Sequence, residues 1–374
     1  MGGCISRLSG RHENSQDDGS AQEAEFAAHL DSVQSSPPRS SIEWQHSPGP
    51  SREAGGGTAS HRVHPARVNE KLRLLTQTLE RASQAGTSSG LMEYGQQVAR
   101  YLSASMQPDE ELLSLDLANL HRLADSYNSR YRDLNLKHMD SSAKFLEALA
   151  DRSSDRAWRA VVRLADDEMH HFAADVRTRA AAPPTVIVME PTDLYTFITP
   201  YSRLRRTTLQ QLGTKPKWAF IGIGVQKSPA DCLMFGMQFA LAAHQEVSTF
   251  DDWHDNLHRH GTIADEGEDS SDYIPSPDAM LEHAEINLFH GEKLLPALFY
   301  KHSHSRGVID GVASYQPGIR DEDVSTSRRD PKTESLARRL EAFAVQRGSR
   351  QYSASIETSR ATKIRTALDR TLFD

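Results

Sequence analysis

The sequence predicts an α+β fold, with strand-like segments in the middle of the chain and helices on either side of them. The helices are indicated by leucines at spacings of three and four residues, such as Leu72, Leu75 and Leu79, which create one apolar face. The strands are indicated by short apolar runs between residues 158 and 226. Acidic or proline-containing turns separate several of these runs.

The individual elements follow from the same two patterns. Helices are expected at residues 68–82, 91–104, 108–127, 142–149, 201–212, 232–244, 334–348 and 357–373. Strands are expected at residues 158–164, 170–177, 185–190 and 218–226. Turns between strands are expected at residues 165–168 and 180–184, a short strand or turn at 295–305, and loops at 261–277 and 307–333.

Length and composition bound the class of protein. The chain has 374 residues and a formal net charge of −8, which fits one large domain or two small ones. This mild acidity argues against a nucleic-acid binder. The two cysteines, Cys4 and Cys232, imply no disulfide framework and suit a reducing compartment. Residues 1–66 are rich in Ser, Gly and Pro, so we expect a disordered leader.

Residues 218–244 suggest a reactive cysteine. An apolar run ends in a polar turn, and Cys232 then begins an apolar stretch that is long enough for a helix. Unpaired N–H groups and the macrodipole at a helix N-terminus favour a thiolate, and Asp231 is expected to cap the same helix. The alternative is a buried structural cysteine, since free Cys is among the most buried residue types.

Partners for a nucleophile occur upstream of Cys232. A nucleophilic cysteine needs a base, and the base needs an orienting carboxylate. His170 lies at the start of one predicted strand and Glu190 ends another. Gln226 precedes Cys232 by six residues, so its amide can return to the sulfur and donate to a developing oxyanion. The sequence thus predicts His170, Glu190 and Cys232 as a triad that Gln226 assists.

The stretches HHFAADVR, TVIVMEP, GVQKSPADCLMF and LPALFYKHSHS resemble the YopJ family of type III secreted effector acetyltransferases, most closely its plant-pathogen branch. The resemblance covers roughly residues 110–305. It implies a mixed-sheet core similar to that of SUMO-specific cysteine proteases, flanked by a regulatory helical region. The expected parts are a leader (1–66), N-terminal regulatory helices (67–150), a catalytic core (151–305) and C-terminal regulatory elements (306–374).

Two adjacent histidines compete for the role of base. Successive strand side chains face opposite ways, so only one of His170 and His171 is expected to point at Cys232. The match of the family's preceding strand to residues 159–164 and the interval from His170 to Asp175 favour His170, and His171 is the alternative. Leu233 stands where the family often has glycine, which puts backbone access beside the sulfur in question.

The resemblance also implies a function. The protein would move acetyl from acetyl-CoA through an acetyl-Cys232 intermediate to Ser, Thr or Lys of host signalling proteins, such as kinases or immune regulators. A type III system would secrete it into the host cell, where it would act in the cytosol or at the plasma membrane. One alternative is a cysteine protease that acts on ubiquitin-like modifiers. Another is a membrane-tethered adaptor whose triad is inert.

A polyanion is expected near the end of the sequence. From Pro331 onward there are nine Lys or Arg residues against five acidic ones, a composition that suits phosphate groups. The family suggests inositol hexakisphosphate as the activator. The candidate residues are Lys301, Arg130, Arg205 and Arg206, and Lys301 also matches the family's self-acetylated lysine. Alternatively, these are ordinary surface charges. Thr358, Ser359 and Thr362 are further candidates for self-modification.

The first residues, Met1-Gly2-Gly3-Cys4-Ile5-Ser6, fit N-myristoylation at Gly2. A palmitoyl chain at Cys4 would supply the second anchor that stable attachment to the host membrane requires. A chance match to this loose pattern is the alternative. His254 and His258 have the spacing of a helical metal pair, but solvated histidines are favoured and no metal is expected. Gly222 and Gly224 lack the third glycine of a dinucleotide-binding loop.

Overall fold

In the computed structural model of the chain, six strands form one mixed sheet whose order in space follows the sequence, β1-β2-β3-β4-β5-β6. The strands are β1 (Leu136–Met139), β2 (Arg156–Arg163), β3 (His171–Arg179), β4 (Ala182–Glu190), β5 (Lys217–Gly222) and β6 (Leu288–His290). β3 is antiparallel to both β2 and β4, as the predicted turns require, whereas β1 pairs with β2, and β5 with β4 and β6, in parallel.

The structure describes residues 64–86, 89–151, 156–165, 169–180, 182–212, 215–263, 287–325, 333–347 and 349–373. These residues belong to one compact unit, Arg62–Asp374. Nearly all of the expected leader, with Gly2 and Cys4, and most of the expected loop at 261–277 lie outside the described residues. Among the described residues, no helix combines the length and apolar character needed to cross a membrane. The division into residues 67–150, 151–305 and 306–374 stays a prediction.

The apolar runs of the sheet are explained by burial on both faces. On one face, Ala173 and Ile187 lie in the same apolar cluster as α7, whereas Phe172 and Val188 belong to a second cluster on the opposite face. Because successive strand side chains point to opposite faces, a strand covered on both sides is apolar at every position. The sheet therefore forms the middle layer of the core.

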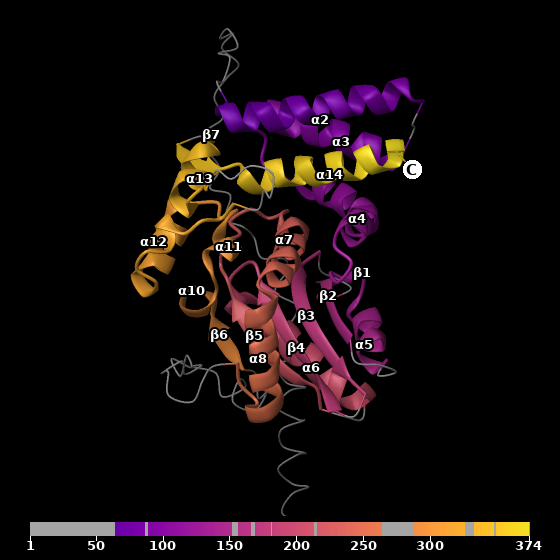
Figure 1. Cartoon of the computed structure of the whole chain (residues 1–374), viewed down its shortest axis with the longest axis vertical. Helices are drawn as coiled ribbons and strands as arrows, with labels where there is room; N and C mark the ends of the chain where they lie inside the picture. The colour runs from indigo at the N-terminus through magenta and orange to yellow at the C-terminus, as the bar shows by residue number, and fades with distance from the viewer. Residues whose placement is uncertain are drawn as a thin grey trace, which may run out of the picture. The chain divides into compact units, whose positions relative to one another are not determined.

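Helices cover the two faces of the sheet (Figure 1). α7 (Cys232–Gln245) and α8 (Val247–His260) pack on one face, and α5 (Ser142–Ala150) and α6 (Ile198–Leu212) contribute apolar side chains to the cluster on the other. α7 approaches the sheet closely at Gly236, where an added Cβ would lie 3.1 Å from Val161 Cγ1.

A helical layer packs over the N-terminal part of α7. It consists of α2 (Ala66–Gln84), α3 (Gly90–Ser103), α4 (Glu110–Arg130) and α14 (Ser355–Phe373). α2, α3 and α14 run side by side in Figure 1, although α14 is separated from the other two by most of the sequence. The buried faces of α2 and α3 confirm the spacing of three and four residues on which their prediction rested.

Four segments differ from the sequence-based expectation. The strand expected at 218–226 ends at Gly222, because Gly224 with φ +68° turns the chain away from the sheet. Residues 295–305 contain the short helix α11 (Ala297–Tyr300). The loop expected at 307–333 contains α12 (Arg306–Tyr315) and the 3-10 helix η2 (Ile319–Asp321).

The prediction of a helix at 334–348 was also wrong beyond its first turns. It is the short helix α13 (Leu336–Ala342), and the chain continues into a hairpin of β7 (Ala344–Arg347) and β8 (Arg350–Ser353). Phe343 and Val345 pack with Val68 and Ala354 in a separate apolar cluster. Tertiary packing of these two side chains on α2 therefore overrides the helical pattern. The remaining elements are α10 (Gly291–Leu294) and the 3-10 helix η1 (Leu194–Phe197).

Candidate active site

The sheet topology brings three segments to one edge. β4 ends at Glu190, which pairs with Gly222 at the end of the parallel strand β5. β3 is antiparallel to β4, with Ala173 opposite Met189, so the start of β3 lies beside the end of β4. His170 and His171 at that start therefore lie close to Glu190. The chain leaving β5 then reaches Cys232, the first residue of α7.

Glu190 is a fully buried carboxylate that is hydrogen-bonded on both oxygens. Its Oε2 lies 2.7 Å from His170 Nε2 and accepts a hydrogen bond from the Tyr201 hydroxyl at 2.5 Å. Its Oε1 accepts from the backbone N–H and the hydroxyl of Thr192, at 2.7 and 2.6 Å. Burial alone would raise the pKa of Glu190, but the charge and hydrogen bonds of these partners hold it below its usual value.

His170 precedes β3 by one residue, and its ring stacks on Phe197 of η1 at a centroid distance of 3.7 Å. Burial works to lower the pKa of His170, but the Glu190 carboxylate, together with an interaction with the Cys232 side chain, raises it to about 10. The ring is therefore an imidazolium at neutral pH. Since Nε2 faces Glu190, Nδ1 is the nitrogen left for Cys232.

His171, the alternative base, has a different environment. Its Nδ1 lies 2.9 Å from the carbonyl oxygen of Met169, which can only accept, so the ring proton is on Nδ1. Burial lowers the pKa of His171 to about 3. Nε2 is buried and has no hydrogen-bond partner among the described residues. His171 is thus a neutral imidazole, and of the two histidines His170 is the one with a carboxylate partner.

Cys232 is buried, with 2% of its surface exposed, at the N-terminus of α7. Its Sγ lies 3.5 Å from the Met169 carbonyl oxygen and 3.9 Å from His171 Nδ1. Leu233, the departure from the family pattern, is fully buried in the apolar cluster that contains α7. The structure thus brings Cys232, both histidines and Glu190 together.

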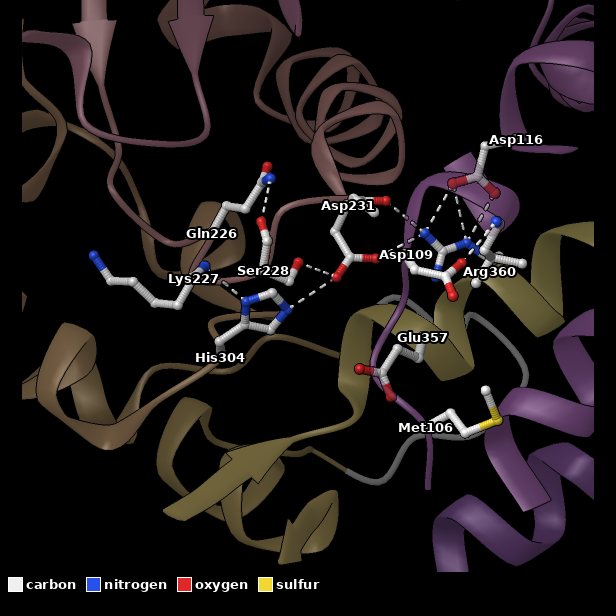
Figure 2. A network of polar contacts seen from close by, with 12 residues as sticks. Met106, Asp109, Asp116, Gln226, Lys227, Ser228, Asp231, His304, Glu357 and Arg360 are labelled. Atoms are coloured by element: carbon white, nitrogen blue, oxygen red, sulfur yellow. Dashed lines mark hydrogen bonds and ion pairs between the residues drawn. The ribbon is translucent and has the colours of Figure 1, made fainter. Parts of the chain in front are cut away.

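Asp231 and Gln226 make contacts that differ from the expected ones. Asp231 occupies the N-cap position of α7, but within the described part of the chain its carboxylate makes no capping hydrogen bond, so that expectation was wrong. The carboxylate instead accepts from the Ser228 hydroxyl and from Arg360 Nη2 (Figure 2). Gln226 Nε2 donates to the Ser228 carbonyl oxygen at 2.7 Å, and its role as an oxyanion donor stays a prediction.

Lys301 lies in a cluster of cations rather than on an open surface. The basic cluster consists of Lys71 on α2, Lys301 after α11, Arg339 on α13 and Lys363 on α14. Burial, followed by the charges of Arg339 and Lys363, lowers the pKa of Lys301 to about 7. Burial, followed by Arg360 and Arg339, lowers the pKa of Lys363 to about 7 as well. Such a cluster is suited to a polyanion.

The other expected polyanion ligands belong to α6 and to the end of α4. Arg205 and Arg206 are on α6, whose apolar side chains join the cluster on the opposite face of the sheet from α14. Arg130 ends α4, with its guanidinium 5.3 Å from the centre of the Tyr131 ring. The sequence does not predict Lys71, Arg339 and Lys363 as polyanion ligands, because only the fold brings them together. The excess of basic residues after Pro331 is the one sequence feature that indicates such a site.

The histidines with metal-pair spacing belong to another polar group. His254 is buried, and its Nε2 lies 3.0 Å from Asp175 Oδ1 while its Nδ1 lies 2.8 Å from the Thr185 hydroxyl. Asp175 is in turn paired with Arg159 and Arg177. These contacts join α8 to the sheet, and they account for His254 without a metal.

Comparison with known proteins identifies the family of the chain. A family model described as YopJ serine/threonine acetyltransferase matches residues 91–366. The serine/threonine-protein acetyltransferase NGR_a02610 of Sinorhizobium fredii is 65% identical over 225 residues, which are 60% of this chain and 86% of that protein. The serine/threonine-protein acetyltransferase HopZ1a of Pseudomonas syringae pv. syringae is 27% identical over 357 residues, which are 89% and 92% of the two chains.

Solved structures extend the comparison to the fold. A crystal structure of HopZ1a in complex with IP6 has a TM-score of 0.69 at 26% identity and covers 82% of this chain and 99% of that chain. A second HopZ1a structure contains IP6 and CoA. A structure of AvrA with IP6 and CoA shares the fold, with a TM-score of 0.57 over 80% and 98% of the two chains. The chain therefore belongs to the YopJ serine/threonine acetyltransferase family.

Proposed function

We propose that the chain transfers acetyl groups from acetyl-CoA to protein acceptors through a covalent acetyl-Cys232 intermediate. The observation that carries the proposal is the His170–Glu190 hydrogen bond of 2.7 Å beside a cysteine at a helix N-terminus. An imidazolium held by a buried carboxylate stabilises a neighbouring thiolate, as the activation of a cysteine nucleophile requires. Membership of an acetyltransferase family supports transfer rather than hydrolysis.

The two half-reactions use His170 in opposite directions. The Cys232 thiolate attacks the thioester carbonyl, and a carbon–sulfur bond to Cys232 forms as the bond to the coenzyme sulfur breaks. His170 gives its proton to that leaving thiolate. In the second half, the acceptor hydroxyl or amine loses a proton to His170 as it attacks the acetyl carbon, and Cys232 leaves as a thiolate. Glu190 orients the ring throughout.

Both half-reactions place negative charge on the carbonyl oxygen. The free N–H of Gln226 and a backbone N–H at the start of α7 are the donors we assign to it. The acceptors we propose are Ser, Thr or Lys of host signalling proteins, reached after type III secretion. Lipids at Gly2 and Cys4 would hold the protein at the host membrane. The expected similarity of the core to SUMO-specific proteases stays a prediction.

Inositol hexakisphosphate is the activator that we propose for the basic cluster. Lys71, Lys301, Arg339 and Lys363 fit it, because they gather positive charge whose mutual repulsion and burial an anion would relieve. The buried Nε of the neighbouring Arg365 has no hydrogen-bond partner among the described residues. The presence of IP6 in HopZ1a structures supports this assignment.

The decisive experiment is incubation of the full chain with radiolabelled acetyl-CoA, with and without inositol hexakisphosphate. We expect label on the protein that depends on the polyphosphate and is absent from Cys232→Ala. Intact-mass measurement and peptide mapping would then locate acetyl groups, with Lys301, Thr358, Ser359 and Thr362 as candidate sites. Cleavage of a fluorogenic ubiquitin-like substrate without labelling would support a protease instead, and host effects that survive Cys232→Ala would support an adaptor.

A further inference from the structure

Backbone and side-chain contacts together hold the segment that leads into Cys232; the N–H groups of Ile223 and Gln226, for example, donate to the carbonyl oxygens of Glu190 and Pro191. Residues 223–231, all of them described, form neither helix nor strand. The segment carries Gln226 near its start and Asp231 at its end, so both a proposed oxyanion donor and the residue next to the nucleophile belong to it. We call residues 223–231 the catalytic loop. Whatever fixes this loop also fixes the relation between Gln226 and Cys232.

The Asp231 carboxylate is the centre of the contacts that fix the loop (Figure 2). It is fully buried and accepts a hydrogen bond from the Ser228 hydroxyl. The backbone carbonyl oxygen of Ser228 in turn accepts a hydrogen bond from Gln226 Nε2. His304 Nε2 lies 3.5 Å from Asp231 Oδ2. The Lys227 backbone N–H donates to His304 Nδ1 at 2.9 Å, so the proton of a neutral ring is on Nε2, the nitrogen that faces Asp231.

Arg360 of α14 binds the other side of this carboxylate. Its Nη2 donates to Asp231 Oδ1 at 2.7 Å and to Asp116 Oδ2 at 2.8 Å, and its Nε donates to Asp116 Oδ1 at 2.9 Å. Asp116 belongs to α4 and also accepts from the Tyr94 hydroxyl of α3. Arg360 and both carboxylates have 0% of their surface exposed. One buried cation thus bridges two buried carboxylates from different elements.

Removal of this cation has a specific consequence. Two carboxylates would remain without a counter-charge in a buried site, which is costly and favours protonation or displacement of one of them. Asp231 would then no longer be a fixed acceptor for Ser228, and the link from Ser228 to Gln226 would loosen with it. The effect reaches the proposed oxyanion donor Gln226, although Arg360 itself makes no hydrogen bond to Cys232 or Gln226 within the described structure.

α14 also connects the loop to the basic cluster. Lys363 follows Arg360 by three residues on the same helix, and Arg360 is a cause of the lowered pKa of Lys363. The helix therefore offers one cation to the catalytic loop and another to the proposed polyphosphate. A second, partly buried ion pair of α14, Arg347–Glu357, joins it to β7 at 2.6 Å. Arg347 makes no hydrogen bond to the described catalytic loop, although the charge of Asp231 contributes to its raised pKa.

We propose that Arg360 is a positioning residue for acyl transfer, which orders the catalytic loop by holding Asp231. Through Arg360, polyphosphate binding at α14 raises the reactivity of Cys232. The inference rests on the proposed function, since it takes Cys232 as the nucleophile and the basic cluster as the polyphosphate site. Arg360 acts through Asp231 and takes no part in bond formation or proton transfer.

The test compares full-length Arg360→Met and Arg360→Lys with Arg347→Met, which breaks the partly buried ion pair between Arg347 and Glu357. We measure inositol hexakisphosphate affinity by calorimetry, the rate of Cys232 alkylation by iodoacetamide with and without the polyphosphate, and acetyl transfer. Arg360→Met should still bind the polyphosphate, with an affinity that reflects the changed charge beside Lys363, but lose the acceleration of alkylation and lose about 100-fold in kcat with a smaller change in KM. Arg360→Lys should recover part of both rates, and Arg347→Met should resemble the wild type.

Several results would overturn the proposal. One is an alkylation response to the polyphosphate in Arg360→Met that equals that of the wild type, and another is an equal loss of this response in Arg347→Met. The others are loss of polyphosphate binding together with reactivity in Arg360→Met, and no effect of the polyphosphate on alkylation of the wild type. If Arg360→Met does not fold, the nearly isosteric Asp231→Asn must show the same separation of binding from reactivity. Absence of acetyl transfer in a wild type whose alkylation still responds through Arg360 would refute the proposed function alone.

Discussion

At the scale of single residues, the adjacent histidines His170 and His171 have different charge states at neutral pH. His170 lies against the Glu190 carboxylate and is charged, whereas His171 is buried with its Nδ1 on the Met169 carbonyl oxygen and is neutral. Local environment, and not residue type, decides which ring is charged at neutral pH. This difference leads to two predictions.

The first prediction compares His170→Asn with His171→Asn in the rate of Cys232 alkylation between pH 6 and 9. Loss of the imidazolium removes the positive charge beside the sulfur, so His170→Asn should react at least about 10-fold more slowly near neutral pH. Asn at position 171 can still donate to the Met169 carbonyl, so His171→Asn should react within a few-fold of the wild type. Equal losses in the two variants would contradict the assignment of roles.

The second prediction concerns stability as a function of pH. The pKa of His170 is raised from 6.5 to about 10, so the charged ring stabilises the fold fully below about pH 6.5, and this contribution is lost as the pH rises through 10. The difference in free energy of unfolding between the wild type and His170→Asn should therefore shrink from pH 6.5 to pH 10. Urea denaturation across this range measures it. A constant difference would show that His170 does not carry the raised pKa.

At the scale of elements, the close approach of α2, α3 and α14 depends on a missing side chain. A Cβ added at Gly95 of α3 would lie 2.8 Å from Leu79 Cδ2 and 3.3 Å from Ile364 Cγ2. The helices can approach to this distance only because the residue is glycine. The same contact joins an early helix to the helix that carries Arg360.

The third prediction follows from this contact. Gly95→Ala should lower the free energy of unfolding by about 1–3 kcal/mol, because overpacking forces the neighbours apart. The matched control is Gly311→Ala on α12, where nothing lies within 4 Å of the added Cβ and alanine should be neutral or stabilising by up to about 1 kcal/mol. Urea denaturation of both variants gives the comparison. A stabilising effect at Gly95 would mean that the helices can separate without loss.

Element prediction succeeded where the local pattern and the tertiary packing agree. α14 and α7 were expected within two residues of their observed bounds. The apolar run that predicted α7 is buried along nearly its whole length. The segment at 334–348 failed because Phe343 and Val345 pack on Val68, a residue far away in the sequence. β5 was predicted to extend to residue 226, because the apolar run continues past Gly222. It ends at Gly222, because the backbone of Gly224 turns the chain away from the sheet.

At the scale of the whole molecule, the candidate site was predictable only in part. His170, Glu190 and Cys232 each follow or precede a strand or helix that the sequence itself indicates, so a shared sheet edge brings them together. Asp116 and Arg360 look like ordinary charges on amphipathic helices, and only the packing of α4 against α14 shows that they meet. The same reason explains why Lys71 and Lys363 were not recognised as neighbours of Lys301.

The fourth prediction concerns the basic cluster as a unit. Lys301 and Lys363 have a pKa of about 7 in the free protein, and a bound polyanion would raise both, so inositol hexakisphosphate should bind with uptake of protons. Affinity should therefore fall as the pH rises above 7. Calorimetry in buffers of different ionisation enthalpy counts the protons. Lys363→Met should bind more weakly and take up fewer protons; unchanged uptake would remove Lys363 from the site.

The position of α14 in the sequence has a consequence for how the protein becomes active. Residues 355–373 contribute Arg360 to the surroundings of Cys232, although the nucleophile lies well over a hundred residues earlier. A ribosome must translate nearly all of the 374 codons before this contact can form. A nonsense mutation or proteolytic cleavage between residues 232 and 355 would thus leave a fragment that keeps the nucleophile but lacks the Arg360 bonds to Asp116 and Asp231.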